Sequence, residues 1–239
     1  METLLIRENN ENLSSIYNIF LNEYSKDEFL QQHRLYITQN NLGYGEDPFH
    51  VMWREIIKEM PNNYKFIEIG VYKGQILSLV KLLSNKLNKN CSILGVSPLN
   101  SKGDSYSKYD ELNYRKIIED LFYQFKIDFD FNRDFIQGDS TDEHIKQEII
   151  SRGFFDLVYI DGCHDYNCVV SDIRLMKLIT KVGSYIVMDD SSCFKIFTEH
   201  NLYKGHYDVC KAVDDELSTD DSFSEIICVG HNRVFKKIK

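Results

Sequence analysis

Three acidic residues follow apolar stretches that have the length of buried strands. Asp161 comes directly after the run 155–160, and Asp189 and Asp190 come directly after the run 184–188. Parallel strands end at the same edge of a sheet, so we expect these carboxylates to lie close together. Clustered carboxylates repel one another unless they are protonated or neutralised by a cation. Hard oxygen donors suit Mg²⁺, Mn²⁺ or Ca²⁺, so the sequence predicts a divalent-cation site at this edge.

His164 stands three residues after Asp161, within reach of a ligand bound at the same edge. Its ordinary pKa of about 6.5 suits a general base that takes a proton from a hydroxyl group. Simpler interpretations stay open, with the adjacent pair of aspartates as a helix cap and His164 as a structural loop residue. We expect Asp165 to be a helix N-cap and Asp172 to lie on a solvated helix face.

A glycine-containing turn follows the earliest apolar run, in the segment 66–74 with the sequence FIEIGVYKG. Gly70 would let the backbone approach a ligand closely, and Gly74 would let a helix pack tightly on the strand. Glu68 could accept hydrogen bonds from the amino end of an amino-acid-like cofactor. The spacing differs from the GxGxxG pattern of dinucleotide sites. The alternative is that the glycines only form a turn and that Glu68 is solvated.

Strand-like and helical patterns alternate along most of the chain. Strand-like runs cover 65–69, 92–96, 134–137, 156–160 and 184–188, and helical stretches cover 49–60, 75–88, 110–126, 142–151 and 167–180. This alternation predicts right-handed crossovers and a mostly parallel sheet. A helix near 207–218 then leads to the runs 223–229 and 233–238, which a turn at Gly230 joins as a hairpin. The predicted fold is α/β and Rossmann-like, with a mostly parallel seven-stranded sheet that ends in an antiparallel hairpin.

The N-terminal part has a different pattern, polar and helical over 1–48, with turn residues at 40–48. We predict an N-terminal helical extension at 1–48 and one domain at 49–239. Two roles fit the aromatic residues near this boundary, a lid over the site or a packed helical layer; these residues are Tyr36, Tyr44, Phe49 and Trp53.

Composition excludes several classes of protein. The 239 residues are 43% hydrophobic, as in an ordinary globular domain, without a run of about 20 apolar residues for a membrane span. The beginning, METLLIRENNENL, lacks a signal peptide's apolar stretch, so we expect a cytoplasmic protein. The net charge of −9 argues against a nucleic-acid partner. We expect reduced thiols at all six cysteines. A zinc site at Cys163, His164 and Cys168 would lack a second ligand pair.

Together these segments resemble the class I S-adenosylmethionine-dependent methyltransferases, and more narrowly the macrolide-sugar O-methyltransferases and cephalosporin-hydroxylase-like proteins. The similar stretches are EIGVYKG, DLVYIDGCHDYNCVVSDI, VGSYIVMDD and DVCKAVDDEL, within residues 50–236. The resemblance implies an S-adenosylmethionine-dependent O-methyltransferase that uses Mg²⁺ or another divalent cation. It implies a small-molecule hydroxyl as acceptor, with a sugar or glycoside preferred, and a homodimer as a further expectation.

The resemblance also implies a role for individual residues. Asp161, Asp189 and Asp190 would hold the metal, and His164 would be the base, with Asp161 beside it as a second catalytic residue. The cofactor contacts would be Glu68, Gly70, Tyr72, Gly74, Ser97, Gly138, Asp139, Ser140 and Asp161, with Asp139 accepting a hydrogen bond from the adenine amino group.

One position departs from the family pattern. Ser97 stands where the family has an acidic residue that binds the ribose hydroxyls. A serine makes only part of those bonds, and each lost bond costs about 1–3 kcal/mol. Asp104, in the following loop, is a candidate substitute. Two other interpretations therefore stay open, a non-methylating, hydroxylase-like member and a degenerate binding module of the same fold.

Overall fold

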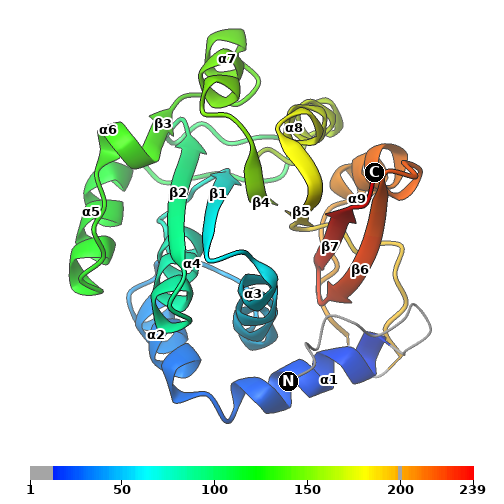
Figure 1. Cartoon of the computed structure of the whole chain (residues 1–239), viewed down its shortest axis with the longest axis horizontal. Coiled ribbons are helices and arrows are strands. Elements are labelled where there is room, and N and C mark those ends of the chain that lie inside the picture. The colour runs from blue at the N-terminus through cyan, green and yellow to red at the C-terminus, as the bar shows by residue number, and fades with distance from the viewer. Residues whose placement is uncertain (1–12, 199–200) are drawn as a thin grey trace.

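The computed structural model describes residues 13–198 and 201–239, and its centre is a seven-stranded sheet in the order β3-β2-β1-β4-β5-β7-β6 (Figure 1). The strands are β1 (Asn63–Ile69), β2 (Asn90–Ser97), β3 (Phe135–Gln137), β4 (Phe155–Ile160), β5 (Thr180–Met188), β6 (Phe223–Val229) and β7 (Asn232–Lys237). The strands β1 to β5 run parallel, whereas β7 is antiparallel to both β5 and β6. The predicted mostly parallel sheet with a terminal hairpin is confirmed.

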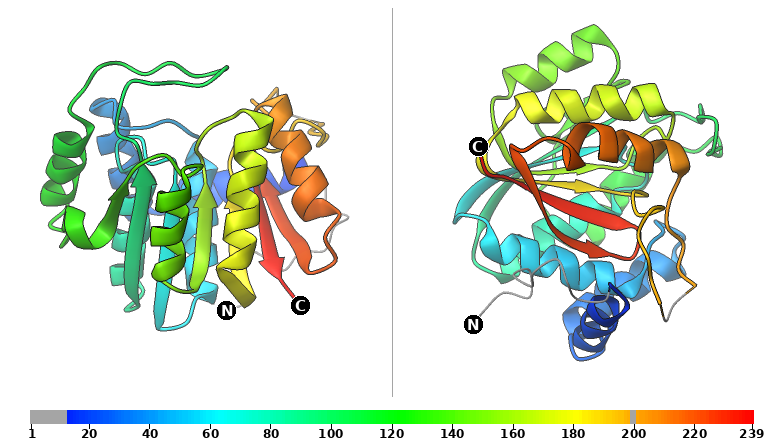
Figure 2. Two further views of the ribbon diagram at one scale, coloured as in Figure 1. Left: turned by 90° about the horizontal axis from the view of Figure 1, so that it is seen from above. Right: turned by 90° about the vertical axis from the view of Figure 1, so that its right-hand side faces the viewer.

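Helices cover both faces of this sheet. They are α1 (Leu13–Tyr24), α2 (Glu28–Gln39), α3 (Asp47–Glu59), α4 (Gln75–Lys86), α5 (Tyr114–Gln124), α6 (Phe131–Asp134), α7 (Glu143–Ser151), α8 (Tyr166–Leu178) and α9 (Tyr207–Val213), which continues as a π-helical turn (Asp214–Ser218). Helices α3, α4 and α5 belong to one apolar core, and α7, α8 and α9 belong to the other, in front of the sheet in the left view of Figure 2.

The strand sequences explain why two cores form. Successive side chains of a strand point to opposite faces of the sheet. In β1, Phe66 packs in the α3–α5 core and Ile67 in the α7–α9 core; in β4, Leu157 and Val158 divide in the same way. The buried positions of these strands are therefore mostly apolar, because both faces of the sheet are covered.

The N-terminal helices pack onto the α3–α5 core through Ile16, Phe20 and Leu30. Trp53 is only 1% exposed and packs edge-on against Tyr159 of β4. Trp53 and its buried neighbour Phe49 therefore contribute to a packed helical layer. Residues 1–12, which include part of the predicted extension and the beginning in which we expect no signal peptide, lie outside the described residues.

The chain between β5 and α9 folds back on itself before the helix begins. A bridge joins Ser191 to Gly205, and a disulfide joins Cys193 to Cys210. The expectation of six reduced thiols is therefore wrong for this pair, because the fold brings together two cysteines that are 17 residues apart. Cys91, Cys163, Cys168 and Cys228 are free. None of the helices in the described ranges is long and apolar enough to cross a membrane.

Candidate active site

Two cavities open at the carboxyl ends of the parallel strands. The β2-side cavity has a volume of about 770 Å³ and is lined by the ends of β1, β2 and β3 and by the loop after β2. The β5-side cavity has a volume of about 430 Å³ and is lined by residues from 42 to 53, the ends of β4 and β5, and the β6–β7 turn. The two share a wall that consists of Gly70, Tyr72, Tyr109 and Asp161.

Gly70 forms the tight turn at this shared wall. Its φ is +95°, and a Cβ atom placed on it would lie 2.0 Å from the carbonyl oxygen of Asp161. Only glycine fits such a position, because any side chain would collide with the backbone after β4. The turn thereby brings the end of β1 against the start of the loop that carries His164.

The predicted cofactor contacts divide between different places. Ser97, Gly138, Asp139 and Ser140 line the β2-side cavity, with Gly70, Tyr72 and Asp161 on the shared wall. Glu68 is 3% exposed and lines the β5-side cavity instead, where burial raises its pKa to about 8. Gly74 is the N-cap of α4, packs against α5 and lines neither cavity.

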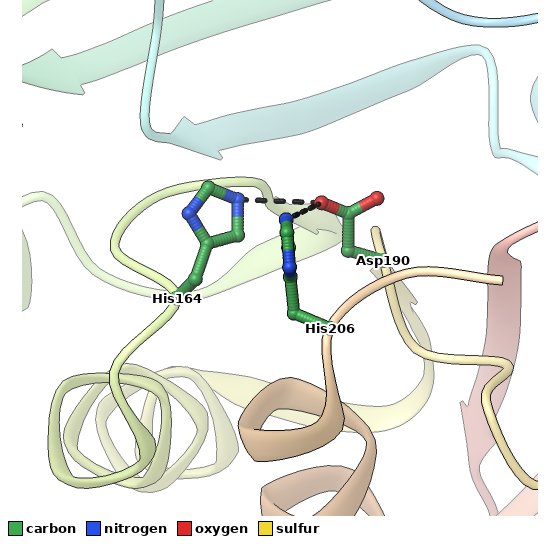
Figure 3. Close-up of side chains that lie close together, drawn as sticks. All are labelled: His164, Asp190 and His206. Atoms are coloured by element: carbon green, nitrogen blue, oxygen red, sulfur yellow. Dashed lines mark ion pairs between the residues drawn. The ribbon is translucent and has the colours of Figure 1, made fainter. Parts of the chain in front are cut away.

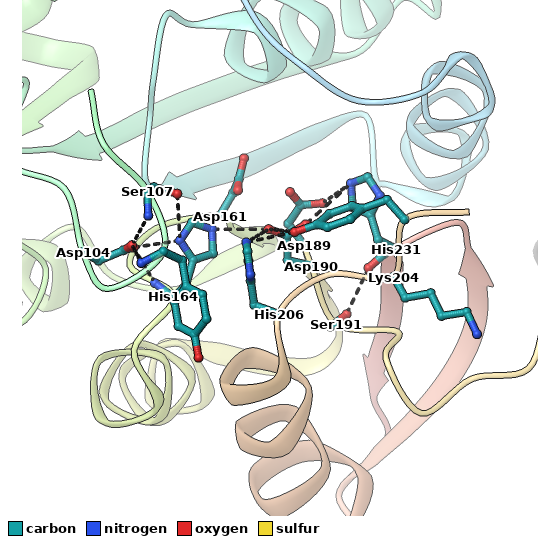
Figure 4. Close-up of polar contacts among 12 residues, drawn as sticks. Asp104, Ser107, Asp161, His164, Asp189, Asp190, Ser191, Lys204, His206 and His231 are labelled. Carbon is teal, nitrogen blue, oxygen red and sulfur yellow. Dashed lines mark hydrogen bonds and ion pairs between the residues drawn. The ribbon is translucent and has the colours of Figure 1, made fainter. Parts of the chain in front are cut away.

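Asp104 is not free to replace the missing ribose-binding acid. Its Oδ1 accepts hydrogen bonds from the backbone N–H groups of Tyr106 (2.8 Å) and Ser107 (2.7 Å). Its Oδ2 accepts the backbone N–H of His164 at 2.8 Å and lies 2.7 Å from His164 Nδ1 (Figure 4). Both carboxylate oxygens therefore hold the loop and the histidine.

His164 is consequently fixed in one orientation. Nδ1–H is donated to Asp104, and the second ring nitrogen, Nε2, lies 3.3 Å from Asp190 Oδ2 on the wall of the β5-side cavity. Burial lowers the pKa of His164, but the hydrogen bond to Asp190 and the charge of Asp104 outweigh it and raise the pKa above its ordinary value. A carboxylate that orients an imidazole in this way is the arrangement of a general base.

The three aspartates lie near one another at the ends of β4 and β5, although Asp161 belongs to neither group of described residues that could hold a metal ion. Asp161 and Asp189 contact each other, and Asp190 follows at the end of β5 with a φ of +50°, unusual for a residue other than glycine. Burial raises the pKa of Asp161 well above its usual value, and the charges of Asp189 and Asp190 raise it further. Burial also raises the pKa of Asp189, but the charge of His231 outweighs it and holds that pKa below its usual range.

Histidines surround the aspartate pair. His206 Nε2 lies 3.5 Å from Asp190 Oδ2, beside His164 (Figure 3). His231 Nε2 lies 3.3 Å from Asp189 Oδ1 and 3.8 Å from Asp190 Oδ1. Two groups could hold a metal ion, namely His164, Asp190 and His206, and Asp189, Asp190 and His231.

Sequence reasoning does not find His206, His231 or Tyr203, whose hydroxyl lies 3.4 Å from Asp190 Oδ2. The sequence places His231 only in a hairpin turn. A local signal exists for neither histidine, because the fold alone brings the β6–β7 turn and the loop before α9 to the end of β5. The expectation of a solvated Asp172 is wrong, since this residue is 1% exposed because α8 turns it inward beneath Gly162.

A chain of hydrogen bonds fixes the tautomer of a further histidine, His50. Ser78 Oγ donates to the carbonyl of Gln75, so it accepts from His33 Nε2 at 3.1 Å. His33 Nδ1 then accepts from His50 Nε2 at 3.0 Å. Burial lowers the pKa of both histidines, to about 3 for His33, so both are neutral. His50 Nδ1 is therefore an unprotonated acceptor on the wall of the β5-side cavity.

This cavity wall carries buried acceptor atoms without a partner among the described residues. They include Glu46 Oε2, His50 Nδ1 and Asn232 Oδ1; Glu68 Oε2 is unpartnered too, but the raised pKa of Glu68 leaves its carboxyl protonated near neutral pH. Buried polar atoms are normally hydrogen-bonded, and leaving one unpaired costs about 1–3 kcal/mol. The β5-side cavity is thus suited to a ligand that supplies several hydrogen-bond donors.

Comparison with known proteins identifies the class of protein that this fold and site define. Residues 67–191 match the family model described as a methyltransferase domain, and the chain belongs to this family. The resemblance to class I methyltransferases is thereby confirmed. The chain is also 31% identical over 170 residues to the uncharacterized protein R132 of Acanthamoeba polyphaga mimivirus. That alignment covers 65% of this chain and 64% of the relative.

Solved structures agree on the fold. An O-methyltransferase from Bacillus cereus in complex with SAH is 12% identical, with a TM-score of 0.58 over 89% of this chain and 91% of that one. The SAM complex of the O-methyltransferase TomG from Streptomyces achromogenes is 10% identical, with a TM-score of 0.57 over 95% and 99%. An SAH-bound methyltransferase from Podospora anserina is 12% identical, with a TM-score of 0.59 over 98% and 99%. The predicted Rossmann-like methyltransferase fold is confirmed.

Proposed function

We propose that this chain is an S-adenosylmethionine-dependent O-methyltransferase that methylates a hydroxyl of a small molecule, a sugar or glycoside, with the help of a divalent cation. The observation that carries the proposal is the shared wall at Asp161. It separates a cavity at the glycine turn, which suits the methyl donor, from a second cavity that holds His164 and the aspartate pair. Structures of the same fold contain SAH or SAM.

The donor set fits a divalent cation. Asp189 and Asp190 belong to one group that could hold a metal ion, and Asp161 lies beside Asp189 at the end of β4. These residues would hold the cation, which would supply positive charge that lowers the pKa of an acceptor hydroxyl. A cation there would offset the negative charge of Asp189 and Asp190 in this buried wall.

The chain's own residues would divide the remaining work. His164 Nε2 faces the β5-side cavity and would take the proton from the acceptor hydroxyl. Asp104 would keep that imidazole oriented and stabilise the positive charge that it gains. Tyr44, stacked on Tyr72 at 5.8 Å, extends the cavity wall outward and would cover a bound acceptor.

A sugar or other polyol matches the β5-side cavity because of its unpartnered acceptor atoms. His50 Nδ1 and Asn232 Oδ1 can each accept a hydrogen bond from a neutral hydroxyl. A site built to bond a hydroxyl discriminates strongly against an analogue that lacks it. We therefore expect deoxy analogues of the true acceptor to react far more slowly.

The test begins with the melting temperature of the purified chain with and without S-adenosylhomocysteine. At about 100 times its Kd the ligand should add about 2.7 kcal/mol, and each kcal/mol raises the midpoint by about 2–4 °C. Transfer of a labelled methyl group from S-adenosylmethionine to a panel of sugars and glycosides follows, with Mg²⁺ or with EDTA. An unchanged melting temperature would contradict the proposal and favour a non-methylating or binding member of the fold.

One observation favours the alternative that this chain is a binding module with the methyltransferase fold. Ser97 Oγ accepts only a long hydrogen bond from Leu99 N, at 3.4 Å, and Asp104 is committed to His164. The acidic residue that would bind the ribose hydroxyls is therefore absent at position 97, and Asp104 does not replace it. If S-adenosylhomocysteine fails to bind, this substitution at Ser97 is the reason to examine first.

A further inference from the structure

The imidazole of His231 reaches both aspartates at the end of β5. Its Nε2 lies 3.3 Å from Asp189 Oδ1 and 3.8 Å from Asp190 Oδ1, and Figure 4 shows the ring directed at the pair. Ligand atoms with bonds of about 2.0–2.2 Å to one cation lie about 3.0–3.5 Å apart at tetrahedral or octahedral angles. The His231–Asp189 separation already fits one cation, and the ligand atoms of all three residues lie within 4.8 Å of one another.

One of these donor atoms, Asp189 Oδ1, and the second ring nitrogen of His231, Nδ1, also lack a hydrogen bond among the described residues. Both atoms are buried, and His231 is only 7% exposed. If Nε2 binds a cation, Nδ1 carries the proton, and Glu46 Oε1 is a carboxylate oxygen 3.9 Å away. Metal-binding histidines usually donate their second N–H to a carboxylate or carbonyl in this way. Glu46 would complete the arrangement.

The other histidine near the pair is a poorer candidate. His206 Nε2 approaches only Asp190 and is already 2.9 Å from the hydroxyl of Tyr203. Its side chain is 25% exposed, whereas that of His231 is 9% exposed. His231 therefore contacts more of the carboxylate pair and has fewer competing partners.

We infer that His231 is a nitrogen ligand of the cation site, together with Asp189 and Asp190. The inference rests on the proposed function, which includes a divalent cation. It changes which cation we expect at the site. Carboxylates alone suit Mg²⁺, whereas an imidazole in the set favours Zn²⁺, Fe²⁺ or Ni²⁺. We therefore expect this site to prefer a first-row transition metal to Mg²⁺ by a larger factor than a site of carboxylates alone.

The experiment titrates Co²⁺ and, separately, Mg²⁺ into the metal-free full chain by calorimetry and records the visible spectrum of bound Co²⁺. Any N/O site prefers Co²⁺ to Mg²⁺, so the informative quantity is how their affinity ratio changes in His231→Ala. We expect that variant to lose at least about tenfold in Co²⁺ affinity, with a smaller loss for Mg²⁺ and an altered Co²⁺ spectrum. His206→Ala is the matched control and should keep both affinities.

Equal Co²⁺ affinity in the wild type and His231→Ala would overturn the inference, and so would a loss confined to His206→Ala. His231 packs edge-on against Phe49, so His231→Gln provides a second variant of similar polarity if the alanine variant does not fold. Pulsed electron paramagnetic resonance of the Mn²⁺-loaded wild type detects nitrogen coordination without any substitution. Binding of S-adenosylhomocysteine is measured in parallel, so failure of the proposed function and failure of the ligand assignment give different results.

Discussion

The two cavities that meet at Asp161 differ in how their polar groups are satisfied. In the β2-side cavity, Asp104 and Asp139 use their oxygens on nearby backbone and side chains, Asp139 bonding Thr141 of its own turn. In the β5-side cavity, polar atoms such as His50 Nδ1 and Glu68 Oε2 are buried without a partner among the described residues. The polar groups of the β2-side cavity are therefore held in place by the protein itself. Those of the β5-side cavity are left to form hydrogen bonds with a ligand and to take part in catalysis.

This difference predicts that His164→Ala will lower turnover, which depends on the β5-side cavity, without changing S-adenosylhomocysteine binding in the β2-side cavity. General-base catalysis contributes about 10²–10⁴-fold, so turnover should fall by that factor. The measurement is the rate of labelled methyl transfer, with the melting temperature and the Kd for S-adenosylhomocysteine as checks. His144→Ala, on the exposed face of α7, is the control and should retain wild-type turnover. Wild-type rates in His164→Ala would remove the base assignment.

Asp104→Asn should act through His164 and therefore more mildly. Loss of a charged hydrogen bond costs about 1.5–3 kcal/mol, which corresponds to about 10–100-fold in rate. Because Asp104 positions the base and does not touch the acceptor, kcat should fall while KM for the acceptor stays constant. A change in KM alone would show that Asp104 has a different role.

Gly70→Ala should damage both cavities, because the glycine forms their common wall. The added Cβ would lie 2.0 Å from the carbonyl oxygen of Asp161, and we expect a loss of about 3 kcal/mol or more in unfolding free energy. Gly183→Ala is a matched control, since its φ of +93° is nearly the same but no atom lies within 4 Å of the added Cβ. It should cost about 1 kcal/mol. Denaturant unfolding of both variants separates collision from backbone strain, and equal losses would refute the collision.

Asp172 makes the region beneath the β2-side cavity sensitive to pH. Burial raises its pKa to about 7, whereas the unfolded value is about 3.9. The native state therefore binds more protons than the unfolded state between about pH 4 and pH 7, and stability falls as pH rises through this window. Asp172→Asn should remove this contribution, on the order of a few kcal/mol, and flatten the profile. The exposed Asp128→Asn should leave the slope of unfolding free energy against pH unchanged.

The smallest effect is expected for Ser97→Asp, which restores the acid at the end of β2. The Kd for S-adenosylhomocysteine should improve by up to about tenfold, since one additional hydrogen bond contributes about 1 kcal/mol. Calorimetry measures this change, and acceptor binding in the β5-side cavity should not respond. A weaker Kd would mean that another group already occupies the ribose position.

The sequence by itself determined the sheet, its crossovers and the place of the chemistry. The segments 157–160 and 185–188 are apolar at every position, and only strands covered on both faces tolerate that pattern. Because parallel strands end at one edge, the sequence alone predicts that Asp161, Asp189 and Asp190 lie together.

Only the tertiary structure decided which groups surround those carboxylates. His206, His231 and the Cys193–Cys210 disulfide depend on how a loop and an antiparallel hairpin close over the end of β5. Such contacts join residues with no fixed spacing or periodicity, so no local pattern encodes them. The same holds for Asp104, which sequence alone placed near the ribose position and which folding commits to His164.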